Sequence, residues 1–134
     1  MIFLLASIDA NSAYSDVVVI VSAESPITKL SNAQINRIFL GKVDSYPDQR
    51  TATPIDQPEG REIRDEFYDK IIHKAPSQVS AYWARVIFTG DGRPPRLVDG
   101  DIAVRQAVAA DPSAIGYIDG SKVDRSVRII QRPQ

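Results

Sequence analysis

The residues best suited to chemistry lie where a predicted strand gives way to a predicted helix. Residues 51–56 fit a short strand, and residues 61–72 fit a helix whose apolar side chains recur every four positions. Such a helix directs its first free N–H groups, and the positive end of its dipole, at whatever lies above the connecting loop. Gly60 and Arg61 are therefore candidate ligands for a small anion. A guanidinium can hold an oxyanion with two hydrogen bonds.

An acidic residue offers a simpler interpretation of the same junction. Glu59 in the loop, or Glu62 reaching back as in a capping box, could satisfy the free N–H groups of the helix without any ligand. A carboxylate at that place would also repel an incoming phosphate. Both interpretations stay open on the sequence alone.

A second candidate cation lies in the segment 89–96, which reads TGDGRPPR. Its glycines and prolines are too dense for a helix or strand, so the segment predicts an irregular loop. Arg93 in this loop could help to hold a carboxylate or phosphate. The alternative is that the loop is a solvated connector.

The chain lacks the usual parts of an active site. It has one histidine and no cysteine, and it contains no nucleophile elbow, phosphate-binding loop or dinucleotide-binding glycine pattern. Asp65, Glu66 and Asp69 share one predicted helix, but they alternate with basic residues as a solvated helix face does. We therefore predict that the protein is not an enzyme and needs no cofactor and no metal.

Composition favours one domain of ordinary size. A chain of 134 residues can bury roughly two thirds of the surface that its unfolded form exposes. The formal net charge is −1, so bulk electrostatics favour neither nucleic acid nor an anionic membrane as a partner. No stretch is long and apolar enough to predict an integral membrane segment.

The N-terminus resembles the tail of a secretory signal peptide. Residues 1–6 are apolar and are followed by small residues at Ala10, Ser12 and Ala13. No lysine or arginine precedes the apolar run, so an ordinary first strand is the alternative. We assign residues 1–14 as the remnant of a signal peptide and residues 15–134 as the domain.

Strands and helices alternate along the rest of the chain, which predicts an α/β domain. The β-branched run 16–22 predicts a strand buried on both faces, which we place at the centre of the sheet. Helical patterns follow Ser31 and Asp101 and cover residues 77–88, and further strands are predicted at 114–118 and 127–130. The expected fold is a mixed sheet of about five strands flanked by four helices. The side chains predicted to be buried are Ile38, Phe39, Phe67 and Trp83.

Several segments recur in an order typical of a known family. Residues 38–43 read IFLGKV ahead of a Tyr-Pro-Asp, and residues 113–118 read SAIGYI. With the 17–22 strand and the junction that leads to Phe67, they resemble the phosphate-binding proteins of ABC transporters. The short single-lobe members of that superfamily also carry stretches like YWAR and FTGDGRPP of this chain. The resemblance implies a single-lobe type 2 periplasmic-binding fold.

The chain departs from this family at the ligand site. The family helix opens with Ser-Gly-Thr, preceded by an arginine, and the matching positions here are Arg61, Glu62 and Ile63, preceded by Gln57. We expect Ile63 to turn into the core. The two-lobed proteins are also about twice as long and close over their ligand, so the family's phosphate-binding residues do not carry over one by one.

Two functions fit these observations. The first is an exported solute-binding-like protein that takes phosphate or a similar small anion at Gly60, Arg61 and Arg93, with millimolar affinity or about 4 kcal/mol. Its expected location is the bacterial periplasm, with an ABC permease or another periplasmic protein as partner. The alternative is a periplasmic accessory or protein-interaction domain that has lost the ligand site. A carboxylate bonded to the helix N-terminus would favour the alternative, whereas a bound anion would contradict it.

Overall fold

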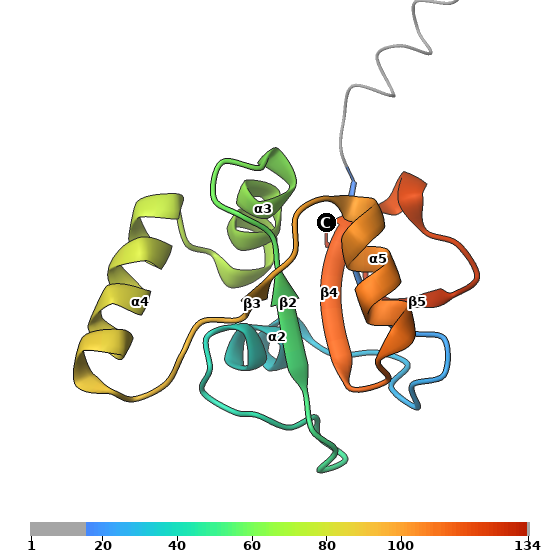
Figure 1. Cartoon of the computed structure of the whole chain (residues 1–134), viewed down its shortest axis with the longest axis horizontal. Coiled ribbons are helices and arrows are strands. Elements are labelled where there is room, and N and C mark those ends of the chain that lie inside the picture. Colours follow the sequence, from blue (N-terminus) through green and yellow to red (C-terminus); the bar gives the residue numbers. More distant parts are fainter. Residues whose placement is uncertain (1–15, 134) are drawn as a thin grey trace, which may run out of the picture.

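The computed structural model describes residues 16–133 and shows a mixed five-stranded sheet with helices on both faces (Figure 1). The strand order is β3-β2-β4-β1-β5. Strand β1 runs antiparallel to β4 and β5, whereas β2 runs parallel to β3 and β4. The strands are β1 (Val17–Ser22), β2 (Thr53–Asp56), β3 (Arg96–Leu97), β4 (Ala114–Asp119) and β5 (Val127–Gln131). The expected α/β class and mixed sheet are confirmed.

Four α-helical segments cover the sheet, as predicted. They are α2 (Asn32–Phe39), α3 (Glu62–Phe67), α4 (Pro76–Thr89) and α5 (Asp101–Ala110). Helix α5 packs on one face and the other three lie on the opposite side (Figure 1). Two short segments complete the structure, the π-helical turn Tyr68–Ile72 and the 3-10 turn Gly120–Lys122. No helix within residues 16–133 is long and apolar enough to cross a membrane. The predicted signal remnant lies outside the described residues.

Strand β1 is buried on both faces, but it is not the middle strand. Val17, Val19 and Val21 enter the larger core, whereas Val18 and Ile20 enter the smaller core beneath α5. The middle position belongs to β4, with β1 next to it. The prediction of a central β1 was wrong in this respect, because a β-branched run reports burial on both faces and not the order of strands.

The predicted helix 61–72 is two elements. Helix α3 ends at Phe67, a π-helical turn follows, and His73 stops it with a left-handed backbone. Phe67 and Ile71 are fully buried as expected. Ile63 only packs against the edge of the larger core, because it lies in the first turn, where α3 borders an open groove.

Helix α4 stands apart at one end of the molecule (Figure 1). It buries Val79 and Trp83, and Trp83 is 7% exposed. Its last turn is open, since Ile87 is 56% and Phe88 91% exposed. The predicted loop 89–96 is shorter than expected, because Thr89 ends α4 and Arg96 begins β3. Both residues of β3 are exposed, so the sequence has no alternation of apolar and polar residues that would predict this strand.

The predicted core residues are confirmed. Ile38, Phe39 and Phe67 are each at most 2% exposed. The Phe67 ring stacks on Tyr117 with centroids 4.0 Å apart and meets Phe39 edge-on at 4.8 Å. Burying such side chains contributes roughly 1.5–3 kcal/mol each.

Gly116 sets how closely α5 approaches the sheet, which gives a first prediction. A Cβ at Gly116 would lie 3.0 Å from Val104 Cγ1 and 3.1 Å from Val108 Cγ2, both on α5. We expect Gly116→Ala to lower the free energy of unfolding by about 1–3 kcal/mol, measured by urea denaturation, because the core is overpacked. Gly92→Ala is the control, since its Cβ would make an ordinary 3.6 Å contact. Equal losses for the two variants would contradict this packing.

Candidate functional site

Gly60 and Arg61 line an open groove of about 830 Å³. One side of the groove is formed by the start of α3, and the other by the segment that leads from β3 into α5. Each side begins directly after a strand, because β2 ends at Asp56 and β3 ends at Leu97. These two strands pair in parallel. The groove therefore lies outside the carboxyl ends of parallel strands, where α/β sheets commonly bind ligands.

The charges around this groove are mixed. Arg61 is the N-cap residue of α3, and its guanidinium forms an ion pair with Asp99. Both side chains are more than half exposed. Glu62 and Asp101 add two further carboxylates to the lining, against one further cation, Lys122. An incoming anion would have to compete with Asp99 for Arg61 in a groove that has more acidic than basic groups.

No carboxylate closes the N-terminus of α3. The helix has no side-chain cap, and Glu59 instead accepts a hydrogen bond from the Ser80 hydroxyl at 3.3 Å. Of the two interpretations left open by the sequence, the one in which Glu59 or Glu62 satisfies these N–H groups is not found, since the Glu59 carboxylate bonds to Ser80 on α4. A carboxylate bonded to the start of α3 would have favoured the accessory interpretation, and the described residues show no such bond.

Arg93 lies elsewhere. It lines a separate pocket of about 440 Å³ with the end of α2 and the start of β2. The structure brings Gly60 and Arg61 together but does not bring Arg93 to them. Ligand binding by any of the three stays a prediction.

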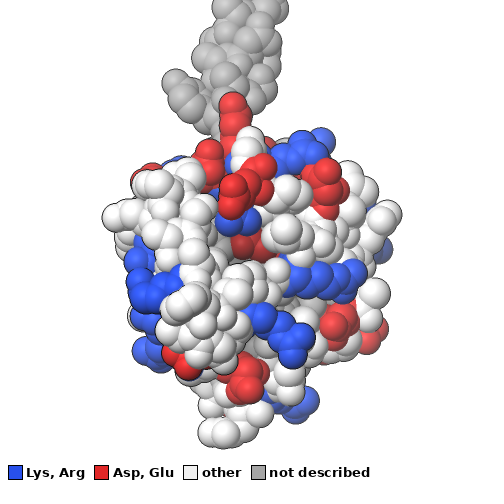
Figure 2. Space-filling view, turned by 60° about the vertical axis from the view of Figure 1, so that its left-hand side comes forward, with Lys and Arg blue, Asp and Glu red and all other residues white. Residues whose placement is uncertain are grey.

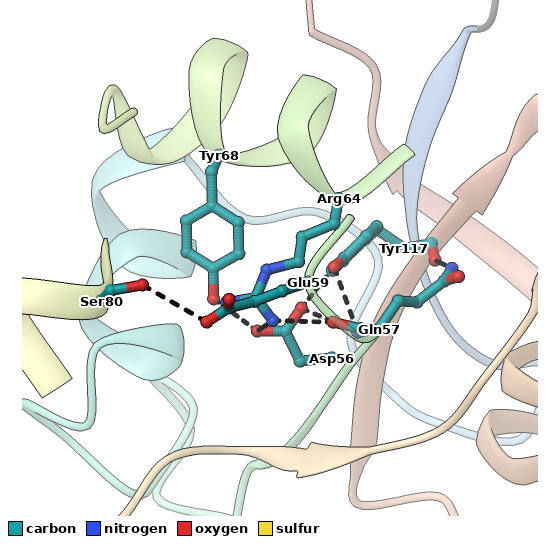
Figure 3. Close-up of polar contacts among 7 residues, drawn as sticks. All are labelled: Asp56, Gln57, Glu59, Arg64, Tyr68, Ser80 and Tyr117. Atoms are coloured by element: carbon teal, nitrogen blue, oxygen red, sulfur yellow. Dashed lines mark hydrogen bonds and ion pairs between the residues drawn. The ribbon is translucent and has the colours of Figure 1, made fainter. Parts of the chain in front are cut away.

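A buried carboxylate lies directly beneath the junction (Figure 3). Asp56 is 2% exposed and accepts hydrogen bonds from the Tyr68 and Tyr117 hydroxyls. It also accepts one from its neighbour, the Gln57 N–H, at 2.8 Å. The Arg64 Nη1 lies 3.4 Å from the second Asp56 oxygen. The negative charge of Asp56 is therefore fully partnered inside the protein.

Gln57 fixes the loop in place. Its side-chain amide donates to Asp101 at 2.9 Å and to the Tyr117 carbonyl at 3.1 Å. Its own carbonyl accepts from Arg64 Nη1 at 2.7 Å. These bonds connect the end of β2 to α3, β4 and α5, so the side chain and carbonyl of Gln57 are both occupied by protein groups.

The sequence interpretation missed this network. The one available signal was an aspartate at the end of a strand, followed by a polar residue, because the carboxyl ends of strands commonly carry functional side chains. Nothing in the sequence indicated that Tyr68 and Tyr117 reach the same carboxylate from two other elements, Tyr68 at Oδ2 and Tyr117 at Oδ1.

Burial holds protons on three tyrosines. The pKa of Tyr68 is raised well above its usual value by burial first and by the nearby Asp56 charge second, with Arg64 opposing the rise. Burial and Asp56 raise the pKa of Tyr117 in the same way. Burial, with smaller effects of Asp111 and Asp48, raises the pKa of Tyr46.

Residues 16–133 contain no group of three or more acidic or histidine side chains placed to hold a metal ion.

The fold is that of phosphate-transport binding proteins. The chain matches a Clostridium perfringens protein described as a phosphate ABC transporter substrate-binding protein, solved with bound phosphate, with TM-score 0.69 and 21% identity over 87% of this chain and 44% of that one. It matches an ABC-type phosphate transport receptor from Vibrio cholerae with TM-score 0.69 and 17% identity, over 87% of this chain and 46% of that one.

These matches confirm the single-lobe fold that the sequence resemblance implied. The chain spans less than half the length of the solved structures that it matches. At such low identity the likeness concerns the fold alone. No family profile matches the chain, and no curated protein is significantly similar to it.

The raised tyrosine pKa values predict that the free energy of unfolding decreases at alkaline pH. Unfolded tyrosines release their proton near pH 10. Because the folded pKa values are raised, the stabilisation is complete below about pH 10 and is lost as the pH rises further, since only the unfolded state releases protons. We expect the free energy of unfolding to fall by about 1.4 kcal/mol per pH unit for each such tyrosine.

Urea denaturation at several alkaline pH values measures this slope, with near-ultraviolet absorbance reporting tyrosinate. Tyr68→Phe is the matched variant and should remove one tyrosine's share of the slope. An unchanged slope in Tyr68→Phe, or tyrosinate of Tyr68 formed in the folded protein, would contradict the prediction.

Proposed function

We propose that this chain is an exported solute-binding-like protein that binds phosphate or a similar small anion weakly at Gly60 and Arg61. The observation that carries the proposal is the position of the groove, at the carboxyl ends of parallel strands in a fold shared with phosphate-binding proteins. The neighbours are solute-binding proteins and not enzymes, which supports a binding role for this chain too.

The proposed affinity is low for a physical reason. Arg61 is exposed and must leave Asp99 to bind an anion, and the lining contains Glu62 and Asp101. A solvated site of this kind is screened by salt. A single lobe also does not enclose the anion, so water continues to compete for the same hydrogen bonds. Millimolar binding, about 4 kcal/mol, fits these constraints.

The proposed setting is the bacterial periplasm, with an ABC permease or another periplasmic protein as partner. The support is the fold of the transport receptors and the signal-like start of the sequence. Fractionation of the native host tests the location. Finding the full-length product in the cytosol would contradict it.

Calorimetry with inorganic phosphate tests the site. We expect a weak saturable heat at low ionic strength that decreases with added salt and is lost in Arg61→Ala. Arg61 is exposed and the N-cap side chain makes no cap hydrogen bond, so the variant should fold as the parent does. Arg93→Ala is the matched control, because it removes an exposed arginine from a separate pocket.

The control also tests the third predicted residue. Loss of the heat in Arg93→Ala with retention in Arg61→Ala would move the site to the pocket of Arg93. No saturable heat in the parent protein would contradict anion binding and leave the accessory function.

A further inference from the structure

A second cleft, of about 420 Å³, lies between α4 and the sheet. This volume falls within the range of small-molecule sites, about 300–1,000 Å³. Its walls are mostly apolar, and three polar residues besides Asp56 line it: Glu59, Arg64 and Ser80. Figure 2, which brings the α4 side forward, shows acidic and basic groups interspersed among wide uncharged areas. The face therefore suits neither nucleic acid nor an anionic surface.

Arg64 supplies a fixed positive group to this cleft. Its side chain is 12% exposed, and its guanidinium lies over the Tyr68 ring at 5.1 Å (Figure 3). Arg64 makes two polar contacts to described residues, one with the Asp56 carboxylate and one with the Gln57 carbonyl, and its Nη1 atom makes both. Nε and Nη2 remain as donors for a planar anionic group such as a carboxylate. Because Asp56 and Tyr68 hold the guanidinium in place, little side-chain entropy is lost on binding.

Glu59 supplies a negative group to the same cleft. Its carboxylate reaches across to α4, where it accepts the hydrogen bond of Ser80 through Oε2 (Figure 3). The Asp56 carboxylate already accepts from two tyrosines and a backbone N–H, so it has little capacity for a ligand. With Asp56 and Arg64 offsetting each other, Glu59 leaves the cleft net negative. A simple anion is thus disfavoured, and a ligand needs an ammonium group beside its carboxylate.

The apolar wall defines the rest of the ligand. Trp83 and Val79 form the buried part, and Ile87 and Leu97 stand 56% and 57% exposed above them. Large aliphatic side chains left open to water on both sides of a cleft are stabilised when an apolar group covers them.

We propose that this cleft binds a zwitterion with an apolar side chain, namely a free apolar α-amino acid. Its carboxylate pairs with Arg64, its ammonium group with Glu59, and its side chain covers Trp83 and Ile87. The site is separate from the groove at Gly60 and Arg61. Residues of the same junction line both, but no residue lines the two together.

Trp83 gives a direct readout, because it is the only tryptophan of the chain and it lines the cleft. Titration of the protein with L-leucine should produce a saturable change in tryptophan fluorescence. N-acetyl-L-leucine lacks the ammonium group, L-leucinamide lacks the carboxylate and glycine lacks the apolar side chain. Each is expected to bind at least about tenfold more weakly than L-leucine.

Single substitutions test which side chains contact L-leucine. Glu59→Gln is nearly isosteric and should weaken L-leucine about tenfold. It should not weaken N-acetyl-L-leucine, because this anion has no ammonium group to lose a partner and is no longer repelled by the Glu59 charge. Arg64→Lys keeps the charge beside Asp56 but loses the planar pair of donors, so it should also weaken L-leucine. Ile87→Ser and Phe88→Ser form a matched pair on α4. Only Ile87 lines the cleft, so only Ile87→Ser should weaken binding.

The proposal is overturned if L-leucine produces no saturable change, or if its two blocked derivatives bind as tightly as the free amino acid. It is also overturned if Glu59→Gln binds L-leucine as the parent does. Arg61→Ala should leave L-leucine binding intact. Loss in Arg61→Ala would place the amino acid in the other groove and contradict the cleft site.

Discussion

The buried carboxylate of Asp56 is the constraint on which the junction depends. An isolated charge at that depth would cost several kcal/mol, so the fold is stable only when its partners are in place. Those partners come from three elements, with Tyr68 in the π-helical turn, Tyr117 on β4 and Arg64 on α3. The network therefore fixes the direction in which the chain leaves β2, and with it the position of every residue that follows in the loop.

The same junction divides its side chains between two cavities. Gly60 and Arg61 face the groove beside α5, whereas Glu59 and Arg64 face the cleft beneath α4. Gln57 anchors the loop between them through Asp101 and Tyr117, so the two cavities lie on either side of one hydrogen-bonded junction.

Helix α4 is the least integrated part of the domain. It is held by Val79, Trp83 and the Tyr82 hydroxyl, which donates to the Leu40 carbonyl at 2.6 Å. Its exposed last turn gives it few apolar contacts with the sheet. Segments with little buried apolar surface open at lower free energy than the core, so the cleft has a wall able to adjust to a ligand.

The sequence by itself determined the elements whose patterns are local. The β-branched run of β1, the helical pattern after Ser31, the apolar repeat of α4 and the motifs of the resemblance were sufficient to predict the class, the positions of four of the five strands and the burial of Phe39, Phe67 and Trp83. Only the tertiary structure decided that β4 is the middle strand, that Arg93 lies apart from Arg61, and that Asp56 has two tyrosine partners. The physical reason is distance along the chain. Periodicity reports which faces are buried, but contacts between residues such as Asp56 and Tyr117, 61 positions apart, form only when the strands are ordered in space.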